Sequence, residues 1–165
     1  MSNTAYTITE ASLEQEFANK LSAGDMQNLH RAYTAGMQFV FSPQTHGQVI
    51  QQFERDLKTH PDSAGVLGAD VAHLMIYLIN ESKGTMPQQI IGPCAILLMA
   101  KACEFISKAN IIPITDQTFA AAVKVMVTAL SAAMNPQFRQ KVGAPNPAQS
   151  APQPSGGLLQ PQGGA

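Results

Sequence analysis

The chain has 165 residues, of which 45% are hydrophobic and 13% charged, and its formal net charge is −1. This length suits one domain with its own core plus a tail. Ten scattered Lys and Arg are offset by eleven Asp and Glu, which argues against direct, sequence-specific nucleic-acid binding. A charged fraction about half the usual share favours lasting contact with other proteins, because solubility as a monomer normally relies on charge.

Three helices are predicted in the N-terminal half. The first covers residues 8–23 and opens with capping-box spacing over Thr7–Glu10. The second has Asp25 as its cap and ends at Ser42-Pro43, and the third covers about residues 45–60. Apolar residues at helical spacing are expected to face the core. They are Leu13, Phe17 and Leu21, then Met26, Leu29, Tyr33, Met37 and Val40, and then Val49, Phe53 and Leu57.

A fourth helix is predicted from a cap at Asp62 or Ser63 to about residue 82. The most apolar stretch, residues 86–108, follows it. Proline suits the first turn of a helix, so we predict a short turn and then a long helix that begins at Pro93.

A sixth helix is predicted after a cap at Thr115, ending at Asn135-Pro136. No alternating pattern typical of strands competes with these helices. The sequence therefore predicts an all-α bundle of about six helices in one domain over residues 1–142. The residues of the sixth helix expected to face the core are Phe119, Val123, Met126, Val127, Leu130 and Met134.

Residues 143–165 form a different kind of sequence, with five Pro, five Gly and no charged side chain. This composition predicts a disordered, flexible tail. Within it, Leu158 and Leu159 are an isolated apolar pair that has no core to bury it. We interpret the pair as an anchor that docks in the pocket of a partner at raised effective concentration, the alternative being plain disorder.

The two cysteines, Cys94 and Cys103, lie nine positions apart in one apolar segment. Helical geometry separates them by roughly 13 Å along the axis, so they cannot form a local disulfide. We predict two buried thiols in a reducing compartment, with a reactive or palmitoylated thiol as the alternative. The N-terminus has no signal-peptide pattern, so we predict residence in the cytoplasm.

No residue set predicts a catalytic, metal or cofactor site. The four histidines lack the spacing of a helical zinc pair. His73 and Asp70 are three positions apart, which is typical of a local surface pair, and a nucleophile built from Cys94 and His73 has no third orienting group. Gly65 and Gly68 follow no strand, so we expect them to admit a neighbouring helix rather than a phosphate. We predict that the chain is not an enzyme.

The segment from Ile90 to Ala100 is eleven residues without a charge, short of the roughly 18 to 20 that span a bilayer. A buried core helix is the main interpretation. The alternative is a surface exposed in an oligomer or at a membrane, and under it Ile96 and Met99 join the leucine pair as candidate partner-binding residues.

In composition and layout the chain resembles the small helical proteins carried in tailed-bacteriophage particles. It shares with them helices rich in Ala and Gln, few charges, and a Pro/Gly/Gln arm at one end. The resemblance implies a structural or head-tail assembly role, or a part in delivering the genome.

These observations predict a non-enzymatic structural or assembly protein in the host cytoplasm or the virion, with the tail as its tether. Its partners would be protein: further copies in a homo-oligomer, or a larger assembly. One alternative is a membrane-active helical protein. The other is an intracellular adaptor or regulator that binds a helix in a groove lined by methionines.

Overall fold

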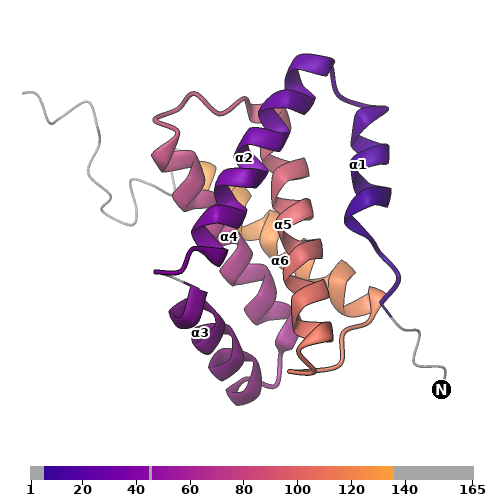
Figure 1. Cartoon of the computed structure of the whole chain (residues 1–165), viewed down its shortest axis with the longest axis vertical. Helices are drawn as coiled ribbons and strands as arrows, with labels where there is room; N and C mark the ends of the chain where they lie inside the picture. The colour runs from indigo at the N-terminus through magenta and orange to yellow at the C-terminus, as the bar shows by residue number, and fades with distance from the viewer. Residues whose placement is uncertain (1–5, 45, 136–165) are drawn as a thin grey trace, which may run out of the picture.

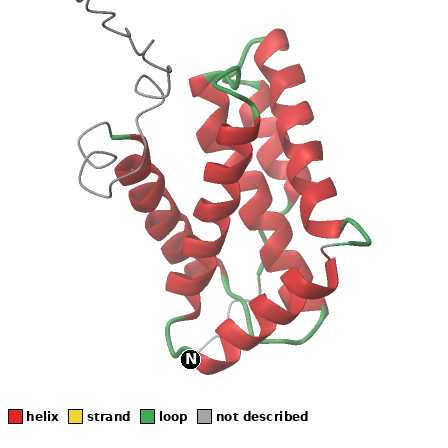
Figure 2. Ribbon diagram, turned by 90° about the vertical axis from the view of Figure 1, so that its left-hand side faces the viewer, coloured by secondary structure: helices red, strands yellow, loops and turns green. Residues whose placement is uncertain are grey.

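The computed structural model describes residues 6–44 and 46–135. These residues form six α-helices and no β-strand (Figure 2), which confirms the predicted all-α bundle. The tail and the predicted domain boundary at residue 142 lie outside the described residues. The helices are α1 (Glu10–Ala18), α2 (Ala23–Phe41), α3 (His46–Thr59), α4 (Ser63–Glu81), α5 (Gln88–Lys108) and α6 (Asp116–Met134).

Side-chain caps fix the starts of four helices, α1, α2, α4 and α6. Asp62 before α4 and Thr115 before α6 each accept a hydrogen bond from the backbone N–H three positions on, as predicted. The cap of α2 is Ser22 rather than Asp25. Asp25 lies instead in the first turn, where a carboxylate is favoured by the helix dipole, and it accepts a hydrogen bond from the Ser22 hydroxyl at 2.7 Å.

Helix α1 is shorter than predicted and begins at a different cap. Thr9 and Ser12 form a reciprocal capping box, and the helix ends at Ala18 rather than near residue 23. Thr7 cannot serve as the cap because it is bonded elsewhere. Its backbone N–H and its hydroxyl donate to the Asp116 carboxylate at 2.8 and 2.7 Å. The N-terminal segment is thereby tied to the first turn of α6.

Helix α5 is one continuous helix, so the predicted start at Pro93 is wrong. The helix begins at Gln88, after Pro87, and Pro93 lies inside it. A proline removes one backbone donor, and at this position the loss falls near the helix start. Burial outweighs it, because ten residues of α5 are buried: Ile90, Ile91, Cys94, Ala95, Leu97, Leu98, Met99, Ala100, Cys103 and Ile106.

Helix α5 is the centre of the bundle, in contact with α1, α2, α4 and α6 (Figure 1). The most extensive contact joins α4 to α6. Gly68 makes this contact possible, because a Cβ added there would lie 2.6 Å from both the Ala122 carbonyl oxygen and the Val125 Cβ. The expected close approach at Gly68 is therefore confirmed. At Gly65 the near neighbour is the capping carboxylate of Asp62 rather than another helix.

The predicted core faces of α3 and α6 include residues that are not buried. On α3, Leu57 is 3% exposed, whereas Val49 and Phe53 are only half-buried. On α6, Val127 is 48% exposed, and Ala122 is buried in the core. The cause on α3 is its position, since among the described helices it contacts only α2 and α4 and does not reach α5.

Candidate functional site

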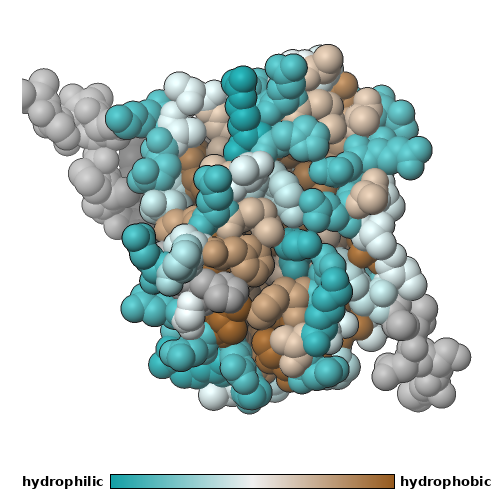
Figure 3. Space-filling model, in the orientation of Figure 1, coloured by the Kyte–Doolittle hydropathy of each residue, from teal (hydrophilic) through white to brown (hydrophobic). Residues whose placement is uncertain are grey.

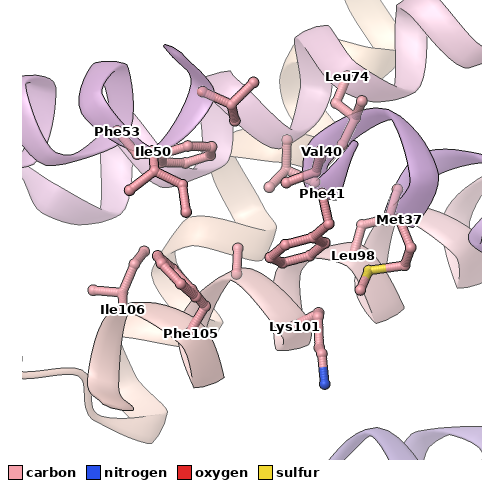
Figure 4. Close-up of a pocket in the computed structure, with 13 residues that line it drawn as sticks. Met37, Val40, Phe41, Ile50, Phe53, Leu74, Leu98, Lys101, Phe105 and Ile106 are labelled. Atoms are coloured by element: carbon pink, nitrogen blue, oxygen red, sulfur yellow. The ribbon is translucent and has the colours of Figure 1, made fainter. Parts of the chain in front are cut away.

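A groove opens where α3 stands away from α5. Helices α2 and α3 form one side, α5 forms the other, and α4 supplies the floor with Val71 and Leu74 (Figure 4). Twelve of the thirteen lining residues are apolar. Side chains of the two sides include Met37 from α2, Val49, Ile50 and Phe53 from α3, and Lys101 and Phe105 from α5.

The groove presents apolar surface to the outside of the molecule. In Figure 3 brown and tan atoms lie between α3 and α5, with hydrophilic teal on both sides. The rings of Phe41 and Phe105 meet edge to face across it, with centroids 6.2 Å apart. The volume of the groove's cavity is only about 40 Å³, far below the roughly 300 to 1,000 Å³ of small-molecule pockets. Such a shallow site suits a few apolar side chains laid on it.

The groove contains no uncompensated charge among its described residues. Its one charged lining residue, Lys101, points to the rim. Its ammonium lies 3.0 Å from the Glu104 carboxylate and 3.7 Å from Glu10 on α1. The hydrogen bond that Lys101 donates to Glu104 is the main reason that the pKa of Lys101 is raised. Apolar contact, rather than charge, would therefore select what binds in the groove.

The contact between α3 and α4 includes an electrostatic conflict. One carboxylate oxygen of Asp70 on α4 is buried and has no hydrogen-bond partner among the described residues. Burial, and then the neighbouring Asp56 on α3, raise the pKa of Asp70, while His73 acts in the opposite direction. Among its described residues, α3 has one buried side chain, Leu57, whose burial stabilises this contact. Helix α3 is accordingly the wall of the groove that is held least firmly.

The four predicted partner-binding residues lie outside the groove or outside the described residues. Met99 is fully buried, so it offers no surface in this structure. Ile96 is partly buried against the core and does not line the groove. Leu158 and Leu159 lie outside the described residues. The predicted methionine-lined groove also differs from the observed one, which contains a single methionine, Met37.

The groups considered for chemistry are separated or inactivated by burial. Cys94 and Cys103 are both fully buried, as expected, and burial raises the pKa of each thiol to about 12. A thiol with such a pKa is protonated at neutral pH and is a poor nucleophile. His73 is exposed and therefore does not share the enclosed environment of Cys94. Over residues 6–44 and 46–135 no three metal-binding side chains cluster.

Three helices are long and apolar enough to cross a membrane, namely α4, α5 and α6. Within its most apolar window α5 is 56% buried, whereas α4 is 33% and α6 22% buried. Three large apolar side chains among the described residues are exposed, namely Tyr77 on α4 and Val125 and Val127 on α6.

No protein-family model, curated protein or solved structure matches the chain. The sequence did not indicate this site, because Val49 and Phe53 have the spacing of residues that face the core. Phe105 had no signal of its own, since only the fold brings it opposite α2 and α3.

Proposed function

We propose that this chain is a non-enzymatic structural or assembly protein that binds an apolar segment of another protein in the groove between α2, α3 and α5. The observation that carries the proposal is the composition of the groove, twelve apolar residues around a shallow cavity with one paired lysine. Contiguous apolar surface rimmed by polar residues is typical of protein-interaction sites.

The chemistry of the groove suggests the kind of segment that binds. The lining is aromatic and aliphatic, and its lysine is paired with two glutamates. An amphipathic helix or a short chain with neighbouring aliphatic side chains would cover this surface without leaving a polar group unpaired. A strongly charged segment would gain little from it.

The proposed partner is a second copy of the chain or a protein of a larger particle. The resemblance in composition and layout to small phage virion proteins suggests a virion and the host cytoplasm as the setting. Light scattering on the full-length protein over a range of concentrations would identify which partner is meant. A defined oligomer would point to a second copy, and a monomer would point to a different protein.

The proposal can be tested with peptides selected for binding to the full-length protein from a displayed random library. The critical comparison is Val49→Glu, on the groove wall, against Val127→Glu, on the exposed face of α6. Both changes replace the same side chain by the same carboxylate. Burying that carboxylate in an apolar contact should weaken peptide binding at least about tenfold in the Val49 variant. The Val127 variant should bind as the wild type does.

Peptides that bind both variants equally would contradict the proposal, as would a library that yields no binder. Circular dichroism must show that both variants remain helical. A Val49→Ser variant provides a milder change should the carboxylate prevent folding, and the same loss of binding is then expected at smaller size.

A membrane-active role is the second candidate, and it is favoured by the three long apolar helices. Insertion would require α5 to leave its contacts with α1 and α2, and it would bring α4 and α5 into the bilayer as a hairpin. Flotation with liposomes at neutral and mildly acidic pH tests this role. Protein that stays at the bottom of the gradient at both pH values would eliminate it.

A further inference from the structure

We propose that Leu158 and Leu159 of the same molecule occupy the groove between α2, α3 and α5. This inference rests on the proposed function of the groove and identifies a ligand that the chain itself carries.

The leucine pair and the groove are chemically complementary. Leu158 and Leu159 are the only large apolar residues in 143–165, a segment without any charged side chain. The groove requires the same chemistry, because its lining is apolar and its one lysine is already paired. Two adjacent leucines on a shallow surface bury apolar area on both partners and leave no charge desolvated.

The chain beyond Asn135 is also long enough for the leucine pair to reach the groove. Leu158 lies 23 positions beyond Asn135, where the described part of the chain ends. A chain spans at most about 3.3 Å per residue, so this segment can extend over roughly 76 Å. A compact body of about 130 residues has a radius of gyration near 14 Å. The leucine pair can therefore reach any part of the surface, although α6 lies on the side of α4 away from α3.

Effective concentration favours docking of the leucine pair on its own molecule over docking on a second copy. A short tether holds its ligand at an effective concentration on the order of millimolar. An affinity of about 1 mM then suffices for roughly half of the molecules to be docked. At micromolar protein concentration a second copy with the same affinity would occupy about a thousandth of the sites.

Paramagnetic NMR on the full-length protein tests this inference. A nitroxide label is attached at Ser155→Cys, three positions before the leucine pair. The native Cys94 and Cys103 need not be replaced, because both are fully buried and protonated. The expected result is a loss of most signal intensity at the amides of residues 49–53 on α3. Amides around Val127 on the exposed face of α6 should keep theirs.

Two controls decide what the signal loss means. In the same labelled protein, Leu158→Ser with Leu159→Ser should restore the α3 signals. In a mixture of labelled ¹⁴N protein and unlabelled ¹⁵N protein, the α3 signals should remain intact, because docking is within one molecule. Loss of signal in that mixture would overturn the proposal in favour of docking between copies.

Broadening spread evenly over the described helices, or unchanged by the leucine substitutions, would also overturn it. Neither result would affect the proposed function, which depends on whether selected peptides discriminate between Val49→Glu and Val127→Glu. If the tail does not dock but the groove still binds peptides, tail docking is refuted and the proposed function stands.

Discussion

The two sides of α4 are built in opposite ways. On one side α6 packs so closely that Gly68 has no room for a side chain. On the other side α3 contributes a single buried side chain, Leu57, and leaves Val49 and Phe53 half-buried. Close packing favours one fixed arrangement, whereas few buried contacts favour local opening. The comparison indicates that the α4–α6 contact is the scaffold and that α3 is the adaptable wall of a binding groove.

The largest expected difference comes from removing the same side chain at the centre and at the edge. Leu97→Ala on α5 should lower the free energy of unfolding by about 3 to 5 kcal/mol, because Leu97 is fully buried. Leu57→Ala on α3 should lower it by only about 2 kcal/mol, since the loosely held helix can shift to fill the space. Urea unfolding followed by circular dichroism measures both. Equal losses would mean that α3 is as firmly packed as the core.

The next test concerns the glycine between α4 and α6. Gly68→Ala should lower the free energy of unfolding by about 1 to 3 kcal/mol, because a new Cβ would collide with the backbone of Ala122 and with Val125. Gly47→Ala on α3 is the control, since a Cβ there would meet nothing within 4 Å outside its chain neighbours and its own helix backbone. It should stabilise the protein by about 0.5 to 1 kcal/mol. A neutral Gly68→Ala would refute the scaffold interpretation of this contact.

The smallest predicted effect concerns Asp70, at the contact between α3 and α4. Because its pKa is raised in the folded state, the fold is most stable when Asp70 is protonated. That stability is lost as pH rises through the raised pKa. Asp70→Asn should therefore increase the melting temperature at neutral pH, and the increase should vanish in acid.

Asp25→Asn is the control of opposite sign. Hydrogen bonds from Ser22 and Gln89 lower the pKa of Asp25, so its contribution is present at neutral pH and is lost on acidification. This variant should be slightly less stable than the wild type at neutral pH. If both substitutions shift the melting temperature in the same direction, the assigned environment of Asp70 is incorrect.

The helices and two of their four side-chain caps could be predicted because they depend on local sequence. Asp62 and Thr115 are polar residues placed directly before apolar periodicity, and both serve as caps. Pro93 misled the prediction because burial of α5 by other helices outweighs one missing hydrogen bond. Rules based on local sequence do not include the free energy gained when other helices bury α5.

The groove could not be predicted because it depends on a distance between two helices. Val49 and Phe53 have the spacing of core residues, and only the separation of α3 from α5 leaves them half-buried. Val127 fits the apolar pattern of α6 equally well, yet it faces outwards. Periodicity identifies an apolar face without telling whether another helix covers it.

Amide hydrogen exchange on the full-length protein would test the contrast between scaffold and groove wall most directly. We expect amides of α3 to exchange through local opening, with much lower protection than amides of α4 and α6, which should exchange only when the whole fold opens. A peptide that binds the groove should slow exchange in α3 and leave α6 unchanged. Protection in α3 equal to that in α6, with no response to such a peptide, would show that α3 is packed as firmly as the scaffold and is not an adaptable groove wall.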